Sequence, residues 1–144
     1  LRETIQLQWI KFACLGEYTN ATGKGSHAEG YYTYAGGINS HSEGYASVVN
    51  GDYSHAGGYY TIASGNNQYV NGKYNIEDLN NLYAVIVGIG TYSNNRLNGY
   101  TLDWNGNGWY AGKATVNDTI PVNDGDLTSK YYIDSILANK ANII

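Results

Sequence analysis

Three histidines recur at intervals of fourteen residues, and they are the side chains in this sequence best suited to chemistry. His27, His41 and His55 each follow a serine, and Glu29 and Glu43 stand two positions after the first two histidines. Imidazole nitrogens and carboxylate oxygens are ligands that zinc takes in proteins. They are also hydrogen-bond partners for each other. The spacing therefore raises two hypotheses, an ion site and a hydrogen-bonded ladder.

The repetition favours the ladder over the ion site. In a trimer each layer would bring three imidazoles to an axis, which resembles a three-histidine metal site, but every coil would then need an ion. Repeat proteins repeat residues mainly for packing, and serine and glutamate in the same strand offer simpler partners. We therefore interpret His27, His41, His55, Glu29 and Glu43 as a trimer-interface ladder, and we expect no metal and no cofactor. Protonation of stacked imidazoles should loosen the assembly below about pH 6.

No pattern in the sequence indicates catalysis. Ser26 and His27 are neighbours, and neighbours in a strand point to opposite faces, so they cannot form a nucleophile and base pair. Glu29 and Glu43 occupy one column of the repeat, which favours a structural role over a paired acid and base. Residues 88–90 read Gly-Ile-Gly but lack the helix of a dinucleotide-binding turn. We expect a protein that is not an enzyme.

Composition excludes several classes of partner. The net charge is -4, and the 8 lysines and arginines are scattered, so there is no basic patch for nucleic acid or an anionic membrane. No run of about 18 apolar residues is present, so membrane insertion is not expected. Cys14 is the single cysteine and has apolar neighbours, which predicts a packed thiol. The 19 glycines and 16 tyrosines among 144 residues favour a narrow, repetitive β-structure.

The elements that must position the histidines are coils of a fourteen-residue repeat. One glycine column comprises Gly16, Gly30, Gly44, Gly58 and Gly72, and the other comprises Gly23, Gly37, Gly51 and Gly65. A short fixed period is typical of a solenoid, in which each unit buries its apolar face against its neighbours. We therefore predict an all-β solenoid over residues 16–72.

Alternation within one copy separates an inner from an outer row, because successive strand residues face opposite sides. The predicted inner row comprises Ser26, Ala28, Gly30, Thr33, Ala35 and Gly37. The predicted outer row comprises His27, Glu29, Tyr32 and Tyr34. Equivalent outer residues should form ladders with a spacing of about 4.8 Å. So thin a roll buries little apolar surface, and we expect self-association to stabilise it.

These residues carry a resemblance to known repeats. The form SHAEGyyTxAsG resembles the YadA-like head repeats of trimeric autotransporter adhesins, which carry SVAIG where this chain has SHAEG. It is more similar to the SHAEG-type repeats near the C-termini of phage tail, appendage and fibre proteins from Gram-positive hosts. Residues 68–78, 83–91 and 100–116 resemble what those phage proteins place after the repeats. Covering residues 16–116, the resemblance implies a left-handed parallel β-roll of 14-residue coils in a homotrimer.

The repeat changes in its last copies. Gly57 stands where the pattern has glutamate, and Gln68 and Tyr69 replace serine and histidine. We interpret these departures as the capping end of the repeat, where the histidine and glutamate ladder is not expected to continue.

We divide the chain into five segments. Residues 1–15 are an N-terminal cap or the end of a stalk, with strand and helix both compatible with the apolar spacing. The β-roll spans 16–72, an antiparallel β meander 73–116, a linker with Pro121 117–127, and a short C-terminal helix with a partial coiled-coil pattern 128–144. Because the chain begins at Leu1, we expect a fragment or a processed piece of a longer protein.

Aromatic residues supply the candidate ligand contacts. Asn105 to Gly108 form a hairpin turn by pattern, and Trp104 and Trp109 on its two sides are expected to pack as a cross-strand pair. The candidate glycan contacts are Tyr31, Tyr32, Tyr45, Tyr59, Tyr60, Trp104 and Trp109. The residue types are equally compatible with contacts to sugars and with packing between subunits.

The function that these patterns favour is a structural and attachment module of a trimeric phage tail or appendage fibre. It would bind a host cell-surface glycan or protein, or trimerise the fibre, on the virion. An alternative is an autoprocessing intramolecular chaperone domain, because some phage appendage proteins with similar C-termini cleave themselves. A further alternative is the head of a trimeric adhesin on a bacterial cell surface.

Overall fold

The computed structural model describes residues 13–113 and 137–138. Residues 13–110 are all-β: a parallel solenoid of about six turns with coils of about 14 residues extends to residue 89, and two antiparallel strands follow it. The strands are β1 (Ala13–Glu17), β2 (Asn20–Ala21), β3 (His27–Tyr31), β4 (Tyr34–Ala35), β5 (His41–Tyr45), β6 (Val48–Val49), β7 (His55–Tyr59), β8 (Ile62–Ala63), β9 (Tyr69–Lys73), β10 (Tyr83–Ile89), β11 (Asn98–Asp103) and β12 (Gly108–Tyr110).

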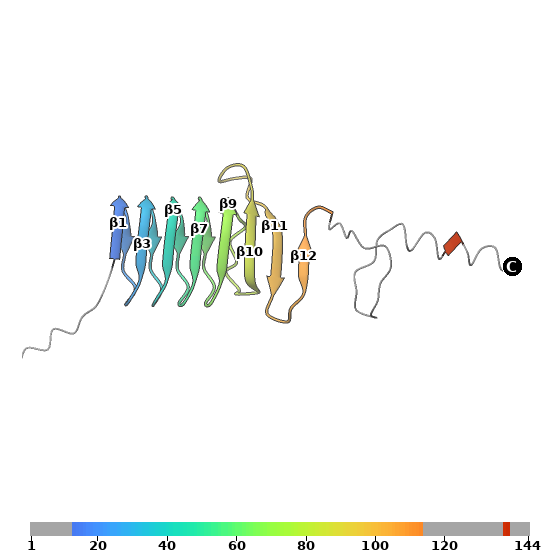
Figure 1. Cartoon of the computed structure of the whole chain (residues 1–144), viewed down its shortest axis with the longest axis horizontal. Coiled ribbons are helices and arrows are strands. Elements are labelled where there is room, and N and C mark those ends of the chain that lie inside the picture. Colours follow the sequence, from blue (N-terminus) through green and yellow to red (C-terminus); the bar gives the residue numbers. More distant parts are fainter. Residues whose placement is uncertain (1–12, 114–136, 139–144) are drawn as a thin grey trace, which may run out of the picture. The chain divides into compact units, whose positions relative to one another are not determined.

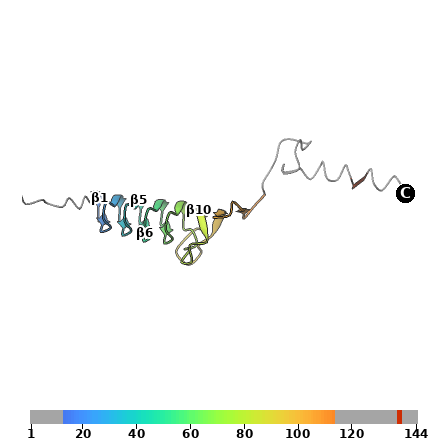
Figure 2. The same cartoon turned by 90° about the horizontal axis from the view of Figure 1, so that it is seen from below.

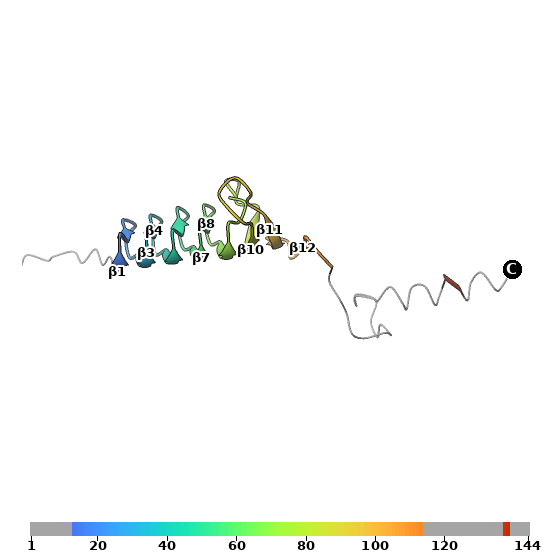
Figure 3. The ribbon, with the colours of Figure 1, turned by 90° about the horizontal axis from the view of Figure 1, so that it is seen from above.

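Each of the first four coils contributes one longer strand and one short strand to two separate sheets. The larger sheet has the order β1-β3-β5-β7-β9-β10-β11-β12, and its strands lie side by side in Figure 1. The smaller sheet has the order β2-β4-β6-β8. Figure 3 shows β4 and β8 to one side of the row that contains β3, β7 and β10, and Figure 2 shows β6 set off from β5 in the same way. The two layers enclose the core.

The pairing register repeats the sequence period. His27 pairs with His41, His41 with His55 and His55 with Tyr69, all in parallel strands. Each step therefore advances by fourteen residues, and equivalent side chains of successive coils stand over one another. The predicted repeat and its ladders are confirmed at the level of the backbone.

The core between the sheets is narrow and is filled by small side chains. The fully buried apolar residues are Ala28, Ala35, Val49, Ala56, Ala63, Val70 and Ile86, each 0% exposed. Several buried hydroxyls are hydrogen-bonded inside the roll: Thr61 Oγ1 donates to Ser47 Oγ at 2.8 Å, and Ser54 Oγ donates to the carbonyl of Gly65 at 2.6 Å. The hydroxyls of Ser26 and Thr33 have no such partner among the described residues. The predicted inner row is buried except for Gly30, which is exposed because it lies at the end of the strand where the chain bends.

Close approach between coils explains the glycine columns. A Cβ atom added to Gly37 would lie 1.9 Å from the carbonyl oxygen of Gly51. At Gly30, where φ is +108°, it would lie 2.1 Å from the carbonyl oxygen of Gly44. Any larger residue would therefore force neighbouring coils apart.

Each coil turns at a corner where a residue other than glycine has positive φ. The residues of this corner column are Tyr18, Tyr32, Ala46, Tyr60 and Tyr74, with φ between 43° and 57°. Such a conformation costs roughly 1–2 kcal/mol per residue. It is held by hydrogen bonds between coils, such as the bond from the amide of Ala46 to the carbonyl of Tyr31 at 2.8 Å.

The solenoid ends in the hairpins β10–β11 and β11–β12. Strand β10 is parallel to β9 and antiparallel to β11, so the sheet continues without a break past the last repeat. The predicted meander therefore continues the larger sheet of the roll. At the other end, residues 13–15, which the sequence assigned to a cap, are the beginning of β1 and pair with β3. The prediction that Cys14 is packed is wrong: it lies on β1, the outermost strand of the larger sheet, and is exposed.

Two buried amides close the C-terminal end of the roll. The side chain of Asn75 accepts from the amide of Ile62 at 2.8 Å and donates to the carbonyl of Ile62 at 2.9 Å, replacing a strand beside β8. Gln68 Nε2 donates to Asp78 and to the carbonyl of Tyr83, both at 3.0 Å. Gln68 thereby ties the last coil to the loop before β10.

Residues 112–113 and 137–138 belong by their contacts to a second unit, Gly112–Ile144. The predicted linker 117–127 and most of the predicted helix 128–144 lie outside the described residues, as do residues 1–12. Residues 137 and 138 are helical. Within the described part of the chain, no helix is long and apolar enough to span a membrane.

Candidate functional site: ladders on the outer face of the larger sheet

The predicted histidine and glutamate ladder forms on the outer face of β3, β5 and β7. The rings of His27 and His41 stack with centroids 4.8 Å apart, and His41 and His55 meet edge to face at 4.9 Å. The Glu29 carboxylate lies 3.7 Å from His27 Nε2 and 3.5 Å from His41 Nε2. Glu43 lies 3.4 Å from His55 Nε2. The ladder thus alternates imidazoles with carboxylates along the roll.

The ladder side chains are partly exposed: those of His27, Glu29 and His41 are 35–37% exposed, and that of His55 is 23% exposed. The Nε2 atoms of the three histidines are themselves buried, and their contacts with the carboxylates are too long or too poorly aligned to be hydrogen bonds. Burial lowers the pKa of His55 from its ordinary value of 6.5, and neighbouring His41 adds to this effect against the opposing pull of Glu43. The environment therefore favours a neutral imidazole at this position.

The same residues bring potential metal ligands together. One ligating atom from each of His27, Glu29 and His41 lies within 4.8 Å of the others, and this is the one such group in the described part of the chain. Two imidazoles and a carboxylate are a ligand set that zinc accepts. The stacked rings hold the two Nε2 atoms one coil apart, so a shared ion would require both rings to tilt.

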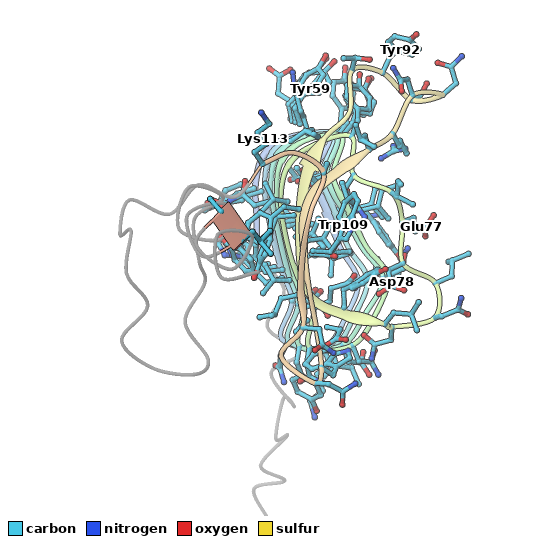
Figure 4. All side chains as sticks on the ribbon, turned by 90° about the vertical axis from the view of Figure 1, so that its right-hand side faces the viewer. Tyr59, Glu77, Asp78, Tyr92, Trp109 and Lys113 are labelled. Carbon is cyan, nitrogen blue, oxygen red and sulfur yellow. The ribbon has the colours of Figure 1, made fainter. Side chains whose placement is uncertain are left out.

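Tyrosines form two further ladders beside the histidines. Tyr31, Tyr45 and Tyr59 stack on the outer face, with centroids 5.2 and 5.1 Å apart. At the corner column, Tyr18 stacks on Tyr32 at 4.5 Å, and Tyr60 stacks on Tyr74 at 4.9 Å. Figure 4 looks along the roll and shows Tyr59 and Tyr92 at the same end of its cross-section. Five of the predicted glycan-contact tyrosines therefore lie together on this edge.

The outer face becomes apolar toward the C-terminal end of the sheet. In the pairing register, Val85 stands beside Tyr69, Val87 beside Asn71 and Ile89 beside Lys73. Across the next pair, Leu102 and Tyr100 continue the same rows. At the N-terminal end, the Leu15 side chain is 61% exposed. The sheet thus presents an uncovered face with histidine, tyrosine and aliphatic side chains.

The prediction that Trp104 and Trp109 pair across the hairpin is wrong. Trp109 stands opposite Thr101 in the register, and Trp104 lies beyond the end of β11, where its Nε1–H donates to the carbonyl of Asn81 at 2.9 Å. The cross-strand aromatic pair is Tyr100 with Tyr110, at 4.8 Å. The two tryptophans line separate grooves, and Figure 4 places Trp109 on the side of the roll where Glu77 and Asp78 lie.

The hairpin turn itself is organised by a carboxylate. Asp103 accepts from the amides of Asn105 and Asn107 and from the Asn107 side chain, each at 2.8 Å. The hydrogen bond from the Asn107 side chain is the main reason that the pKa of Asp103 is lowered. The turn predicted at residues 105–108 is therefore a closed, hydrogen-bonded unit.

The sequence patterns did not single out two residues that lie beside the tyrosines, Ala46 and Arg96. Ala46 interrupts the corner tyrosine column, a difference visible once the repeats are aligned. Arg96 lies beyond the repeats, yet its Nη1 donates to the carbonyls of Tyr60 at 2.9 Å and Asn75 at 3.1 Å. No local pattern connects it to the roll, since 36 residues separate it from Tyr60.

Comparison with known proteins identifies no relative: no family model, no curated protein and no solved structure matches the chain.

Proposed function

We propose that this chain is a non-enzymatic structural and attachment module of a trimeric phage tail or appendage fibre, built from left-handed rolls. The observation that carries the proposal is the uncovered outer face of the larger sheet. On it, the side chains of His27, Glu29 and His41 are each 35–37% exposed. A second and third copy of the chain would cover these partly exposed side chains.

Packing energetics support self-association. The buried apolar core consists mainly of alanine and valine, and the larger of its two clusters holds five residues. So small a core stabilises an isolated chain weakly. Exposed aliphatic and aromatic side chains such as Leu15, at 61%, and Tyr110, at 54%, would become buried if three outer faces met around an axis.

The assignment to a virion appendage rests on the SHAEG-type repeats and on the segments that follow them. A stiff roll with a coil spacing of about 4.8 Å suits a fibre, because length is added coil by coil. The corner column of tyrosines, which lies where the coil turns away from the outer face, would remain outside such a trimer and supply the surface for attachment to a host glycan or protein. The chain would then act by binding and by holding subunits together.

Thiol accessibility tests the proposed interface directly. In a Cys14→Ser background, Glu43→Cys places a thiol in the ladder, and Asn50→Cys places one beside the smaller sheet, where Asn50 is exposed. We expect a maleimide reagent to modify the cysteine at 50 rapidly and that at 43 only after denaturation. Equal, rapid modification of both folded variants would contradict an interface on the ladder face.

A further inference from the structure

The corner column of tyrosines contains one gap. Tyr18, Tyr32, Tyr60 and Tyr74 share the column with Ala46, which has the same backbone conformation, with φ of 52°. Two stacked pairs of rings, Tyr18 on Tyr32 and Tyr60 on Tyr74, therefore flank a position without a ring.

The gap has the size of one six-membered ring. Tyr32 and Tyr60 are two coils apart, which corresponds to about 9.6 Å at the usual strand spacing. A ring placed midway would lie about 4.8 Å from each of them. The existing pairs in this column stack at 4.5 and 4.9 Å. A ligand ring in the gap would therefore continue the stack without displacing Tyr32 or Tyr60.

The walls of the gap form a groove of about 470 Å³. Its lining residues are Tyr32, Tyr45, Ala46, Val48, Tyr60, Ile62 and Arg96. Aromatic and aliphatic groups form most of this surface, and the tyrosine hydroxyls and the guanidinium supply its polar groups. A few polar groups on a mainly apolar surface are typical of small-molecule sites. A sugar ring combines C–H faces for stacking with hydroxyls for such polar groups.

Arg96 gives the groove a charge preference. One of its nitrogens donates to two backbone carbonyls, and its guanidinium lies 5.6 Å from the centre of the Tyr74 ring. No carboxylate pairs with it among the described residues. A guanidinium has five N–H donors, so further donors remain for a ligand. A fixed positive charge with no paired carboxylate would attract an anionic group at this point of the surface.

We propose that the groove at Ala46 binds a pyranose ring that carries an anionic substituent, with the ring between Tyr32 and Tyr60 and the anionic group toward Arg96. This inference deepens the proposed attachment function and names the class of host-surface ligand. It assigns Tyr32, Tyr45 and Tyr60 of the candidate glycan contacts to one site.

The test is a titration of the full chain with methyl glucuronoside and with methyl glucoside, followed by the methyl NMR signals of Val48 and Ile62. We expect saturable shifts with a Kd in the millimolar range, and weaker binding of the neutral sugar. Ala46→Tyr should abolish the shifts, because the residue used elsewhere in this column fills the gap. Ala46→Gly is the matched control, since it keeps the gap and the positive φ, and it should bind as the parent does.

Each alternative result is decisive. The proposal is overturned if neither sugar shifts these signals at concentrations up to about 50 mM, or if Ala46→Tyr binds as well as the parent. Shifts that depend on protein concentration without sugar would assign the groove to a second copy of the chain and also overturn it. Arg96→Lys should keep the preference for the anionic sugar, whereas Arg96→Gln should remove it. Monosaccharide binding does not require a fibre, so this result is independent of the thiol-protection test.

Discussion

The glycine columns allow coil contact and backbone strain to be separated by experiment. In Gly37→Ala, the new Cβ atom lies 1.9 Å from the carbonyl oxygen of Gly51 in an ordinary backbone conformation. The two coils must separate locally, at a cost of about 2–3 kcal/mol. In Gly106→Ala, φ is +86° but nothing lies within 4 Å, so only strain of about 1–2 kcal/mol applies. Gly30→Ala combines both effects and should cost about 3–5 kcal/mol.

Thermal unfolding of these variants measures how much stability each substitution removes. All variants must be compared at one protomer concentration, because association adds to stability. Gly37→Ala should unfold about 10–20 °C below the parent. Gly112→Ala is the control without contact or positive φ, and it should change the midpoint little. If Gly37→Ala is as stable as Gly112→Ala, the close stacking of coils that underlies this account is wrong.

Three further predictions concern single residues of the last coils and the ladder. Because the pKa of His55 is lowered in the folded chain, the unfolded chain binds a proton more readily, and stability should fall as pH drops through about 6.5. The urea midpoint of His55→Gln should depend less on pH than that of the parent chain. An equal dependence on pH in both chains would argue against this. Gln68→Ser, which restores the repeat residue, should lower the free energy of unfolding by about 1–3 kcal/mol, because Asp78 and the carbonyl of Tyr83 each lose a hydrogen bond from Gln68. An unaltered urea midpoint would contradict it. Equimolar zinc should leave the thermal midpoint unchanged, and a rise abolished by His41→Ala would instead support an ion site.

The sequence determined the parts of the fold that follow from repetition. A fourteen-residue period fixes which residues pair, so the registers of His27 with His41 and His41 with His55 could be read in advance. Alternation also located the buried alanines, because only small side chains fit between sheets this close together.

Features that break the repeat, or that connect distant segments, could not be predicted in this way. The Trp104 and Trp109 pairing failed because β12 begins at Gly108, which places Thr101 and not an aromatic residue opposite Trp109. Tyrosine at positive φ is uncommon, and nothing local marks it, since the stabilising hydrogen bonds come from the preceding coil. The contact of Arg96 with Tyr60 depends on how a long loop folds back.

We propose that other copies of the same chain complete the outer face of the larger sheet. Sedimentation equilibrium of the full chain at neutral pH tests it most directly, because the mass is obtained without a model of shape. We expect a species of three times the 15.7 kDa chain mass that persists at micromolar concentration. A stable, folded species of 15.7 kDa under the same conditions would contradict it.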